Sequence, residues 1–134
     1  MSRKPARVLI VDDHEAVAEA LASLINDERD MRVVGTAGSV AESITRVTEL
    51  QPDVVLLDFR LPDGTGADAG NVIHQDHPQT KLIFVTRDDT TAARMAAIDA
   101  GASAFIHKSQ AASKVVDAIR VVVGGGRLVN PEAG

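Results

Sequence analysis

Short apolar runs alternate along this chain with longer segments of helical period. Five runs are rich in Val, Ile and Leu and nearly continuous, which is typical of parallel strands buried on both faces. The stretches between them repeat apolar residues every three or four positions, which predicts helices covering those faces. The pattern therefore predicts an α/β fold of five strands and five helices, with strands near residues 7–11, 31–37, 53–57, 81–85 and 103–106.

Two of the helices have a clear apolar stripe. The first is predicted over residues 14–26, where Val17, Leu21 and Leu24 share one face. The last is predicted over residues 110–123 and ends at three consecutive glycines, residues 124–126.

Two other helices are defined by their local residue types. Ser39 and Glu42 are spaced as a capping box and predict the start of the second helix. The third is predicted near residues 67–75, where Gly70 and Asn71 both have poor helix propensity. We expect this helix to be short or mobile.

Polar side chains stand where four of the predicted strands end. They are Asp12 and Asp13 after the first strand, Asp58 after the third, Thr86 after the fourth and Lys108 after the fifth. The carboxyl ends of parallel strands share one edge of a sheet, and ligands bind in the crevice outside that edge where the strand order reverses. The sequence therefore predicts that these side chains converge on one pocket.

Each of these residues also has a simpler interpretation when taken alone. Asp13 precedes a helix and is a good N-cap residue. Asp58 can serve the turn over residues 61–64, Lys108 suits a solvated strand end, and Thr86 suits a turn. Their joint placement in chain order is what favours a functional site.

Three acids in one pocket favour a bound cation and phosphate chemistry. Asp12, Asp13 and Asp58 would raise one another's pKa values unless a positive charge neutralised them. Mg²⁺ prefers oxygen ligands and commonly binds with a phosphate group. A carboxylate can attack phosphorus, and the Lys108 ammonium and Thr86 hydroxyl suit phosphoryl oxygens. The predicted cofactor is therefore Mg²⁺.

The composition is that of one domain without disulfides. A chain of 134 residues with 45% hydrophobic content can bury a core of its own. The absence of Cys excludes disulfides and Cys-based zinc sites and is compatible with a reducing cytoplasm, the location we expect. The apolar run near the N-terminus is too short for a signal peptide or a membrane span, so we expect no membrane association.

The charge pattern argues against direct binding of nucleic acid. The net charge is −5, and the 14 basic residues form no stripe. The aromatic residues are Phe59, Phe84 and Phe105, too few to favour stacking on bases. Glycine-rich phosphate loops are also absent from the sequence. Any contact with DNA is expected to belong to another domain.

The motifs resemble the receiver domain of bacterial two-component response regulators. They are VDD at 11–13, LLD at 56–58, LPDGTG at 61–66, VT at 85–86 and the lysine at 108, and the resemblance covers about residues 5–124. The start VLIVDDHEAV, the segment VVGTAGSVAESI and Ser109, where many receivers have proline, resemble the NarL/FixJ (LuxR-type) subfamily. The resemblance implies a flavodoxin-like (CheY-like) doubly wound parallel sheet in the order 2-1-3-4-5.

The resemblance also implies the ligands of the cation. Asp58 would be the phosphoacceptor and a metal ligand. Asp13 would bind Mg²⁺ directly, Asp12 would bind it mainly through water, and the backbone carbonyl of Arg60 would be a further ligand.

A switch is the function that the resemblance implies. A sensor histidine kinase would donate its phosphoryl group to Asp58, and the domain would catalyse this transfer and slow hydrolysis. Thr86 would move toward the phosphoryl group, and Phe105, three residues before Lys108, would turn inward as the aromatic switch. A homodimer would form on phosphorylation, through either the fourth helix, fifth strand and fifth helix or the first and fifth helices.

A division of the longer protein is implied as well. Residues 1–124 would be the receiver domain, and residues 125–134 would begin a linker to a C-terminal helix-turn-helix domain outside this chain. DNA binding and transcriptional control would then belong to the full protein.

Three residues are expected at the mouth of the site, and one of them departs from the residue that receivers usually have there. Arg87 follows Thr86, where receivers usually have a small residue bordering the route to the phosphoryl group. Arg60 and Asp88 stand two residues beyond Asp58 and Thr86, at positions that tune hydrolysis, and their charges are predicted to pair. We expect a long-lived phosphoryl state.

Rival interpretations remain open at this point. An aspartyl-nucleophile phosphatase would need a second acid two residues after Asp58, where this chain has Arg60. A pseudo-receiver that acts as an interaction module without phosphorylation would keep every motif, with Arg87 blocking the site. His74 and His77 have the spacing of a metal pair, but a solvated helix end explains them better.

Overall fold

The five apolar runs form one parallel sheet. The computed structural model describes residues 4–129. Its strands are β1 (Ala6–Val11), β2 (Met31–Ala37), β3 (Val54–Leu57), β6 (Lys81–Thr86) and β7 (Ala102–His107), hydrogen-bonded in the order β2-β1-β3-β6-β7. This is the order 2-1-3-4-5 of the five predicted strands, so the doubly wound, flavodoxin-like architecture is confirmed.

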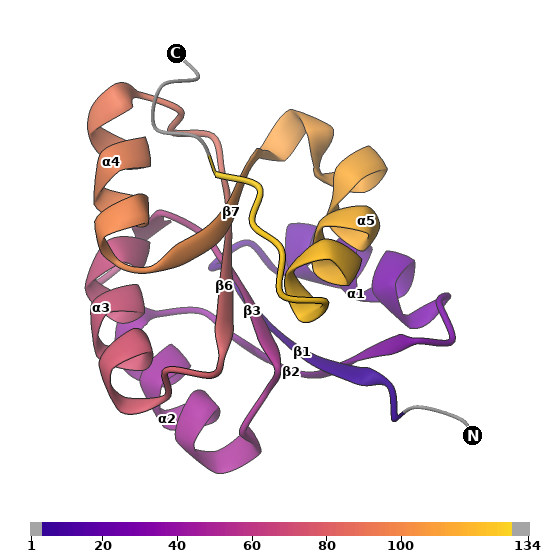
Figure 1. Cartoon of the computed structure of the whole chain (residues 1–134). Helices are drawn as coiled ribbons and strands as arrows, with labels where there is room; N and C mark the ends of the chain where they lie inside the picture. The colour runs from indigo at the N-terminus through magenta and orange to yellow at the C-terminus, as the bar shows by residue number, and fades with distance from the viewer. Residues whose placement is uncertain (1–3, 130–134) are drawn as a thin grey trace.

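Five helices cover the two faces of the sheet (Figure 1). They are α1 (Glu15–Asn26) and α5 (Ala111–Val123) on one face, and α2 (Val40–Leu50), α3 (Gly66–Asp76) and α4 (Thr91–Asp99) on the other. Successive side chains of a strand point to opposite faces of the sheet, so the strands contribute side chains to two hydrophobic cores, one on each face. Ile10 and Leu56 pack with α1 and α5, whereas Val11 and Leu57 pack under the other three helices.

The expectation that the third helix is short is wrong. α3 is a regular helix of 11 residues. Thr65 and Asp68 form a capping box at its N-terminus. A Cβ atom added at Gly70 would lie 3.2 Å from the Cβ of Ala100, so this glycine allows close packing of α3 against its neighbours. Tertiary packing outweighs the low propensity that the sequence indicates.

Half of the capping box predicted for the second helix is present. The Ser39 hydroxyl accepts from the Glu42 amide at 3.0 Å, but the Glu42 carboxylate accepts from the Gly38 amide instead of that of Ser39. The Asp63 carboxylate accepts from the first two amides of α2 at 2.7 and 3.1 Å. These two backbone hydrogen bonds lower the pKa of Asp63 below 3.8.

A small hairpin that the sequence pattern did not predict connects β3 to α3. Its strands are β4 (Arg60–Leu61) and β5 (Gly64–Thr65). The hairpin returns the chain to the end of β3, where the Gly66 amide donates to the Phe59 carbonyl at 2.7 Å. A Cβ atom at Gly66 would overlap the backbone oxygen of Asp58. The loop that carries Asp58 is therefore packed directly against the first residue of α3.

The segment after α5 lies beside β7. Residues 127–129 run along this edge strand between α4 and α5 (Figure 1). The linker predicted over residues 125–134 stays a prediction, and residues 130–134 lie outside the described part of the chain. Across residues 4–129, the helices are too short or too polar to cross a membrane.

The contact at Gly66 generates a stability prediction. We expect Gly66→Ala to lower the free energy of unfolding by about 1–3 kcal/mol, because the new methyl group must displace the backbone of Asp58. Urea unfolding followed by far-UV circular dichroism measures the loss. Gly124→Ala is the matched control, since its Cβ would meet its nearest neighbour at 3.4 Å, and its effect should stay within about 0.5 kcal/mol. Equal losses in the two variants would contradict the steric account.

Candidate functional site

Three predicted acids meet at the carboxyl edge of the sheet, between β1 and β3. Asp12 and Asp13 follow β1, and Asp58 follows β3. β1 and β3 are neighbours in the sheet although β2 lies between them in the sequence, so the strand order reverses here. The Asp58 amide donates to the Val11 carbonyl at 2.9 Å, which continues the sheet past the end of β3 and fixes the start of this loop.

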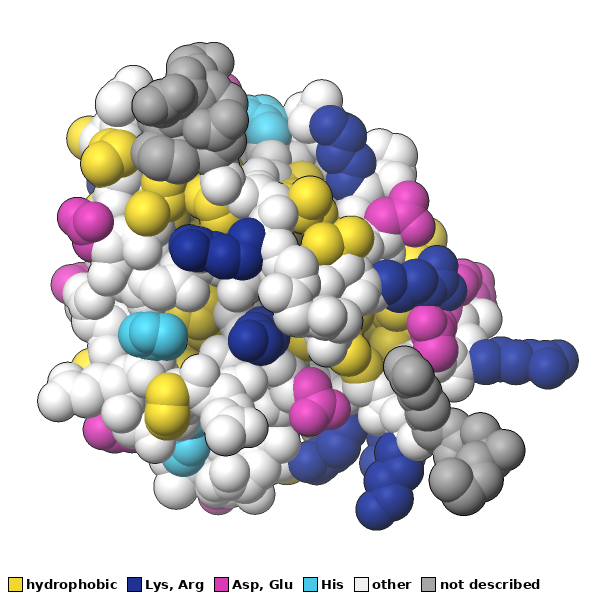
Figure 2. Space-filling view, in the orientation of Figure 1, with side chains coloured by type: hydrophobic (Ala, Val, Ile, Leu, Met, Phe, Trp, Pro, Cys, Tyr) yellow, Lys and Arg dark blue, Asp and Glu magenta, His cyan; other side chains and the backbone are white. Residues whose placement is uncertain are grey.

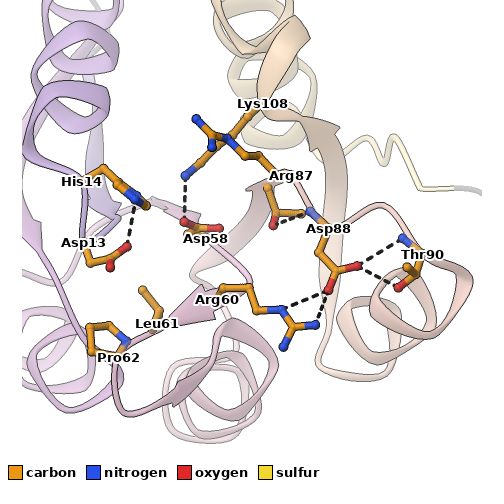
Figure 3. A pocket seen from close by; sticks show the side chains of 11 residues that line it. Asp13, His14, Asp58, Arg60, Leu61, Pro62, Arg87, Asp88, Thr90 and Lys108 are labelled. Atoms are coloured by element: carbon orange, nitrogen blue, oxygen red, sulfur yellow. Dashed lines mark hydrogen bonds and ion pairs between the residues drawn. The ribbon is translucent and has the colours of Figure 1, made fainter.

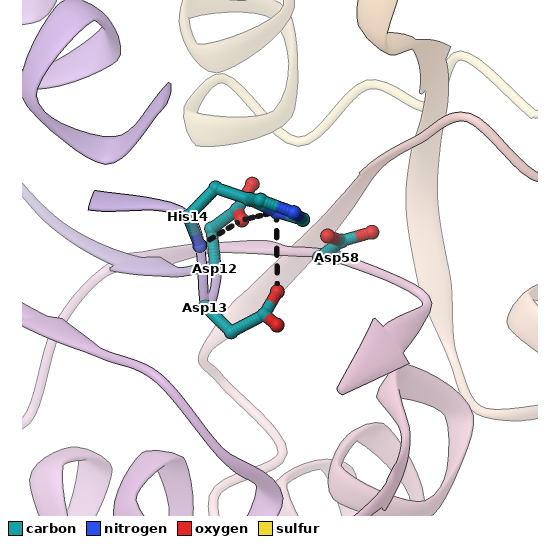
Figure 4. A group of neighbouring side chains, drawn as sticks. All are labelled: Asp12, Asp13, His14 and Asp58. Carbon is teal, nitrogen blue, oxygen red and sulfur yellow. Dashed lines mark hydrogen bonds and ion pairs between the residues drawn. The ribbon is translucent and has the colours of Figure 1, made fainter. Parts of the chain in front are cut away.

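His14 joins these acids. One ligand atom from each of Asp12, Asp13, His14 and Asp58 lies within 4.8 Å of all the others. The His14 ring nitrogen Nδ1 is 3.1 Å from Asp12 Oδ1 and 3.2 Å from Asp13 Oδ1 (Figure 4). His14 also occupies the N-cap position of α1, so the alternative role of Asp13 as an N-cap is not observed. Three carboxylates in one cluster are a donor set that fits a hard divalent cation.

Lys108 bridges the two most deeply buried acids. Its Nζ lies 2.8 Å from Asp58 Oδ2 and 2.9 Å from Asp12 Oδ2, and the three side chains are 10%, 5% and 4% exposed respectively. Burial alone would lower the pKa of Lys108. The hydrogen bonds to Asp58 and Asp12 outweigh burial and raise this pKa above 10.5. Lys108 therefore stays a cation and neutralises one of the three negative charges.

A second ion pair lies at the mouth of the site. The Arg60 guanidinium donates to Asp88 Oδ2 at 2.7 and 3.1 Å, which is the predicted pairing of their charges (Figure 3). The Thr90 hydroxyl donates to Asp88 Oδ1 at 2.8 Å and accepts from the Ala93 amide as the N-cap of α4. The hydrogen bond from the Thr90 side chain, followed by that from Arg60, lowers the pKa of Asp88. Hydrogen bonds through Thr90 thus connect the mouth of the site to the N-terminus of α4.

The two predicted switch residues occupy different surroundings. The Thr86 hydroxyl lines the pocket and accepts from the Asp88 amide at 3.2 Å. Phe105 is a core residue, 9% exposed, and its ring is stacked on that of Phe84 at a centroid distance of 6.5 Å. The Arg94 guanidinium covers the Phe105 ring, with its carbon 4.7 Å from the ring centroid. Phe105 therefore already points inward, and it does not line the pocket.

An open hollow of about 720 Å³ lies in front of Asp58. Arg87 is exposed and lines this hollow on the side where Lys108 enters, and Arg60 and Asp88 lie across from it (Figure 3). The predicted site residues that share the lining are Asp13, Asp58, Arg60, Thr86, Arg87, Asp88 and Lys108. Asp12 does not line the hollow and is connected to the site by its ion pair with Lys108.

Some residues of the site were not predicted from the sequence. Thr90 has a local signal, since a Thr before the alanine-rich segment of α4 is a typical N-cap. His14 is another such residue, and its position directly after Asp13 is the signal that could have found it. The contact of Arg94 with Phe105 has no local signal, because the two residues come from different elements.

The hydrogen bonds of Asp88 give a titration prediction. Deprotonated Asp88 stabilises the fold above its unfolded pKa, and this contribution is lost as the pH falls through the lower folded pKa. Carboxyl ¹³C NMR should place the titration of Asp88 below 3.8. In Arg60→Ala the midpoint should rise but stay lowered, because the hydrogen bonds from Thr90 remain. An ordinary Asp88 midpoint in the wild type would contradict this account.

Comparisons with known proteins show what this chain is similar to. Residues 8–120 match the family described as the response regulator receiver domain. The chain is 35% identical over 126 residues to the response regulator protein VraR of Staphylococcus epidermidis, which covers 94% of this chain and 60% of VraR. It is 36% identical over 128 residues to the response regulator GacA of Pseudomonas viridiflava, which covers 94% and 59%.

One solved structure is similar to this chain over almost its whole length. The LuxR-family two-component response regulator from Aurantimonas sp. SI85-9A1 has a TM-score of 0.88 and 31% sequence identity, covering 96% of this chain and 92% of that one. The chain spans about 60% of the length of the curated relatives named above.

Proposed function

The chain belongs to the response regulator receiver domains of two-component systems, in the NarL/FixJ type, and from that premise we propose a phosphorylation-activated switch with Asp58 as phosphoacceptor. The observation that carries the proposal is the contact of Lys108 with Asp58 at 2.8 Å, inside a cluster of three carboxylates. A nucleophile, a fixed cation and a set of oxygen ligands therefore share one open pocket.

The proposed reaction transfers a phosphoryl group to the Asp58 carboxylate. An Asp58 oxygen attacks phosphorus, the bond between phosphorus and the donor breaks, and the donor departs with the bonding electrons. Lys108 pairs with a phosphoryl oxygen, and the Thr86 hydroxyl gives up its bond from the Asp88 amide and donates to another. Positioning and charge stabilisation are the main contributions that a protein makes to phosphoryl transfer.

Mg²⁺ is the proposed cofactor. Asp12, Asp13 and Asp58 would hold it, with the backbone carbonyl of Arg60 as a further ligand. When bound, the cation neutralises charge on the carboxylates and on the phosphoryl oxygens. The excess of negative charge in the cluster supports this assignment, because Lys108 offsets only one of three carboxylates.

The proposed output is a change of conformation that is read outside the site. A shift from about 1% to about 99% active molecules requires phosphorylation to favour the active state by roughly 5.5 kcal/mol. New contacts of Lys108 and Thr86 with the phosphoryl group supply part of this difference. The proposed partners are a sensor histidine kinase as donor, a second copy of the chain on activation, and DNA through a C-terminal domain that follows residues 125–134.

A phosphorylation-independent interaction module is the second candidate, and Arg87 is the observation that favours it. Its exposed side chain lines the pocket where incoming phosphoryl donors would approach. A cation at this position can obstruct a donor or attract an anionic one. Arg87→Ala separates these effects through the rate of phosphorylation.

The first experiment on this function is intact-mass measurement after incubation with acetyl phosphate and Mg²⁺. We expect the wild type to gain one phosphoryl group, and Asp58→Ala and the wild type without a divalent cation to gain none. Asp76→Ala, which removes an exposed acid at the end of α3, is the matched control and should react like the wild type. If the wild type and Arg87→Ala both fail with acetyl phosphate and with candidate kinases, the module without phosphorylation is the better account.

The ion pair at the mouth predicts a long-lived phosphoryl state. In the double variant Arg60→Ala, Asp88→Ala, we expect dephosphorylation to be about tenfold faster, which corresponds to about 1.4 kcal/mol of barrier, because water reaches the phosphoryl group more easily. Decay of the phosphorylated mass with time measures the half-life. Arg120→Ala removes ion pairs with Glu28 and Asp30, which lie away from the acid cluster, and is the control. A half-life in the double variant close to that of the wild type would show that the pair does not shield the product.

A further inference from the structure

The chain turns sharply after α5 and is directed back to the sheet. The Gly126 amide donates to the Val121 carbonyl at 2.9 Å, and the Gly125 amide donates to the Val122 carbonyl at 3.0 Å. Gly125 has φ +93°, a conformation that side chains disfavour. This combination is a Schellman motif, which sets the direction of the chain as it leaves the helix. The glycines therefore form a specific turn.

The turn delivers residues 127–129 to the outer edge of β7. The Leu128 amide donates to the Ser103 carbonyl at 2.7 Å, and Leu128 pairs with Ala104 in a parallel bridge. The Arg127 guanidinium donates to the Ala102 carbonyl at 3.1 Å. Three successive residues of β7 thus contact the segment. We call residues 127–129 the β7 strap.

The strap is also anchored in the core. Val129 is partly buried and packs against the hydrophobic cluster that contains Phe84 and Phe105. Leu128 is 49% exposed, so its role here is carried by its backbone amide. On the face where the strap lies, apolar side chains emerge between charged and uncharged ones without forming one continuous patch (Figure 2). The strap covers part of a sheet edge that would otherwise offer free hydrogen-bonding groups.

Two parts of the proposed switch lie on β7 or directly after it. Phe105 directly follows Ala104, the partner of Leu128, and Lys108 directly follows the last residue of β7. A change in the position of Phe105 or in the partners of Lys108 therefore acts on β7, the strand whose residues 102–104 contact the strap. Because α5 begins three residues after Lys108, the strap and α5 are both connected to this strand.

We propose that the β7 strap is a readout device, whose pairing with β7 changes with the phosphorylation of Asp58 and passes that change to any segment that follows. The proposal rests on the proposed function. Coupling of this kind is reciprocal, so a change in the strap must also alter the surroundings of Phe105. An inert clamp would hold residues 127–129 equally in both states.

One pair of glycine substitutions tests the strap without phosphorylation. Gly125→Ala is strained by its positive φ although its Cβ would meet nothing within 4 Å, whereas Gly124→Ala adds the same methyl group at φ −77°. In Gly125→Ala we expect the Leu128 amide to exchange with solvent at least tenfold faster and the ring signals of Phe105 to shift. Gly124→Ala should leave both unchanged. The ring spectrum is simple, because the chain has three Phe, no Tyr and no Trp.

The second arm compares amide exchange with and without acetyl phosphate and Mg²⁺, with the phosphorylated fraction followed by intact mass. We expect exchange of the Leu128 amide to change at least tenfold on phosphorylation of the wild type and to stay constant in Asp58→Ala. Phosphorylated protein with unchanged exchange would overturn the strap and leave the proposed function standing. A chain that never gains the phosphoryl group would overturn both. Faster Leu128 exchange in Gly125→Ala with unmoved Phe105 signals would identify an inert clamp.

Discussion

The ammonium group of Lys108 lies between the carboxylates of Asp12 and Asp58, and the organisation of the site depends on this contact. Two buried carboxylates without a cation would repel each other and lose hydration, whereas one bridging Lys offsets both effects. The third acid, Asp13, is 34% exposed and leaves the cluster with excess negative charge. The two buried acids are therefore compensated by Lys108, and the cluster remains suited to a further cation. It also places a positive charge where a phosphoryl oxygen would arrive.

The sheet topology explains why these groups meet. β1 and β3 are adjacent because the chain crosses to β2 and returns on the other side of β1, so the acids that follow them lie at the reversal of strand order. Lys108 follows the edge strand β7 and reaches inward to the same point. β7 also contacts the segment after α5, so the strand that leads into Lys108 is connected to the end of the domain.

Much of the fold and site could be predicted from the sequence, because apolar period and the polar residues at strand ends are local signals. The strand order agrees with the one that the resemblance to receiver domains implied, and the Arg60–Asp88 pair was expected from the positions of these two charges relative to the family motifs. α3 was misjudged, because the fit of Gly70 against Ala100 depends on residues distant in sequence. The roles of Thr90 and Arg94, and the pairing of Leu128 with β7, depend on contacts between separate elements.

The central claim is that the Asp58 carboxylate, which pairs with Lys108 in the acid cluster, accepts the phosphoryl group. It is tested most directly by treating the phosphorylated protein with borohydride, which reduces an aspartyl phosphate to homoserine, followed by peptide mass mapping. The account predicts homoserine at position 58 and unmodified Asp12 and Asp13. Homoserine at another acid, or a phosphoryl group that borohydride does not remove, would contradict it.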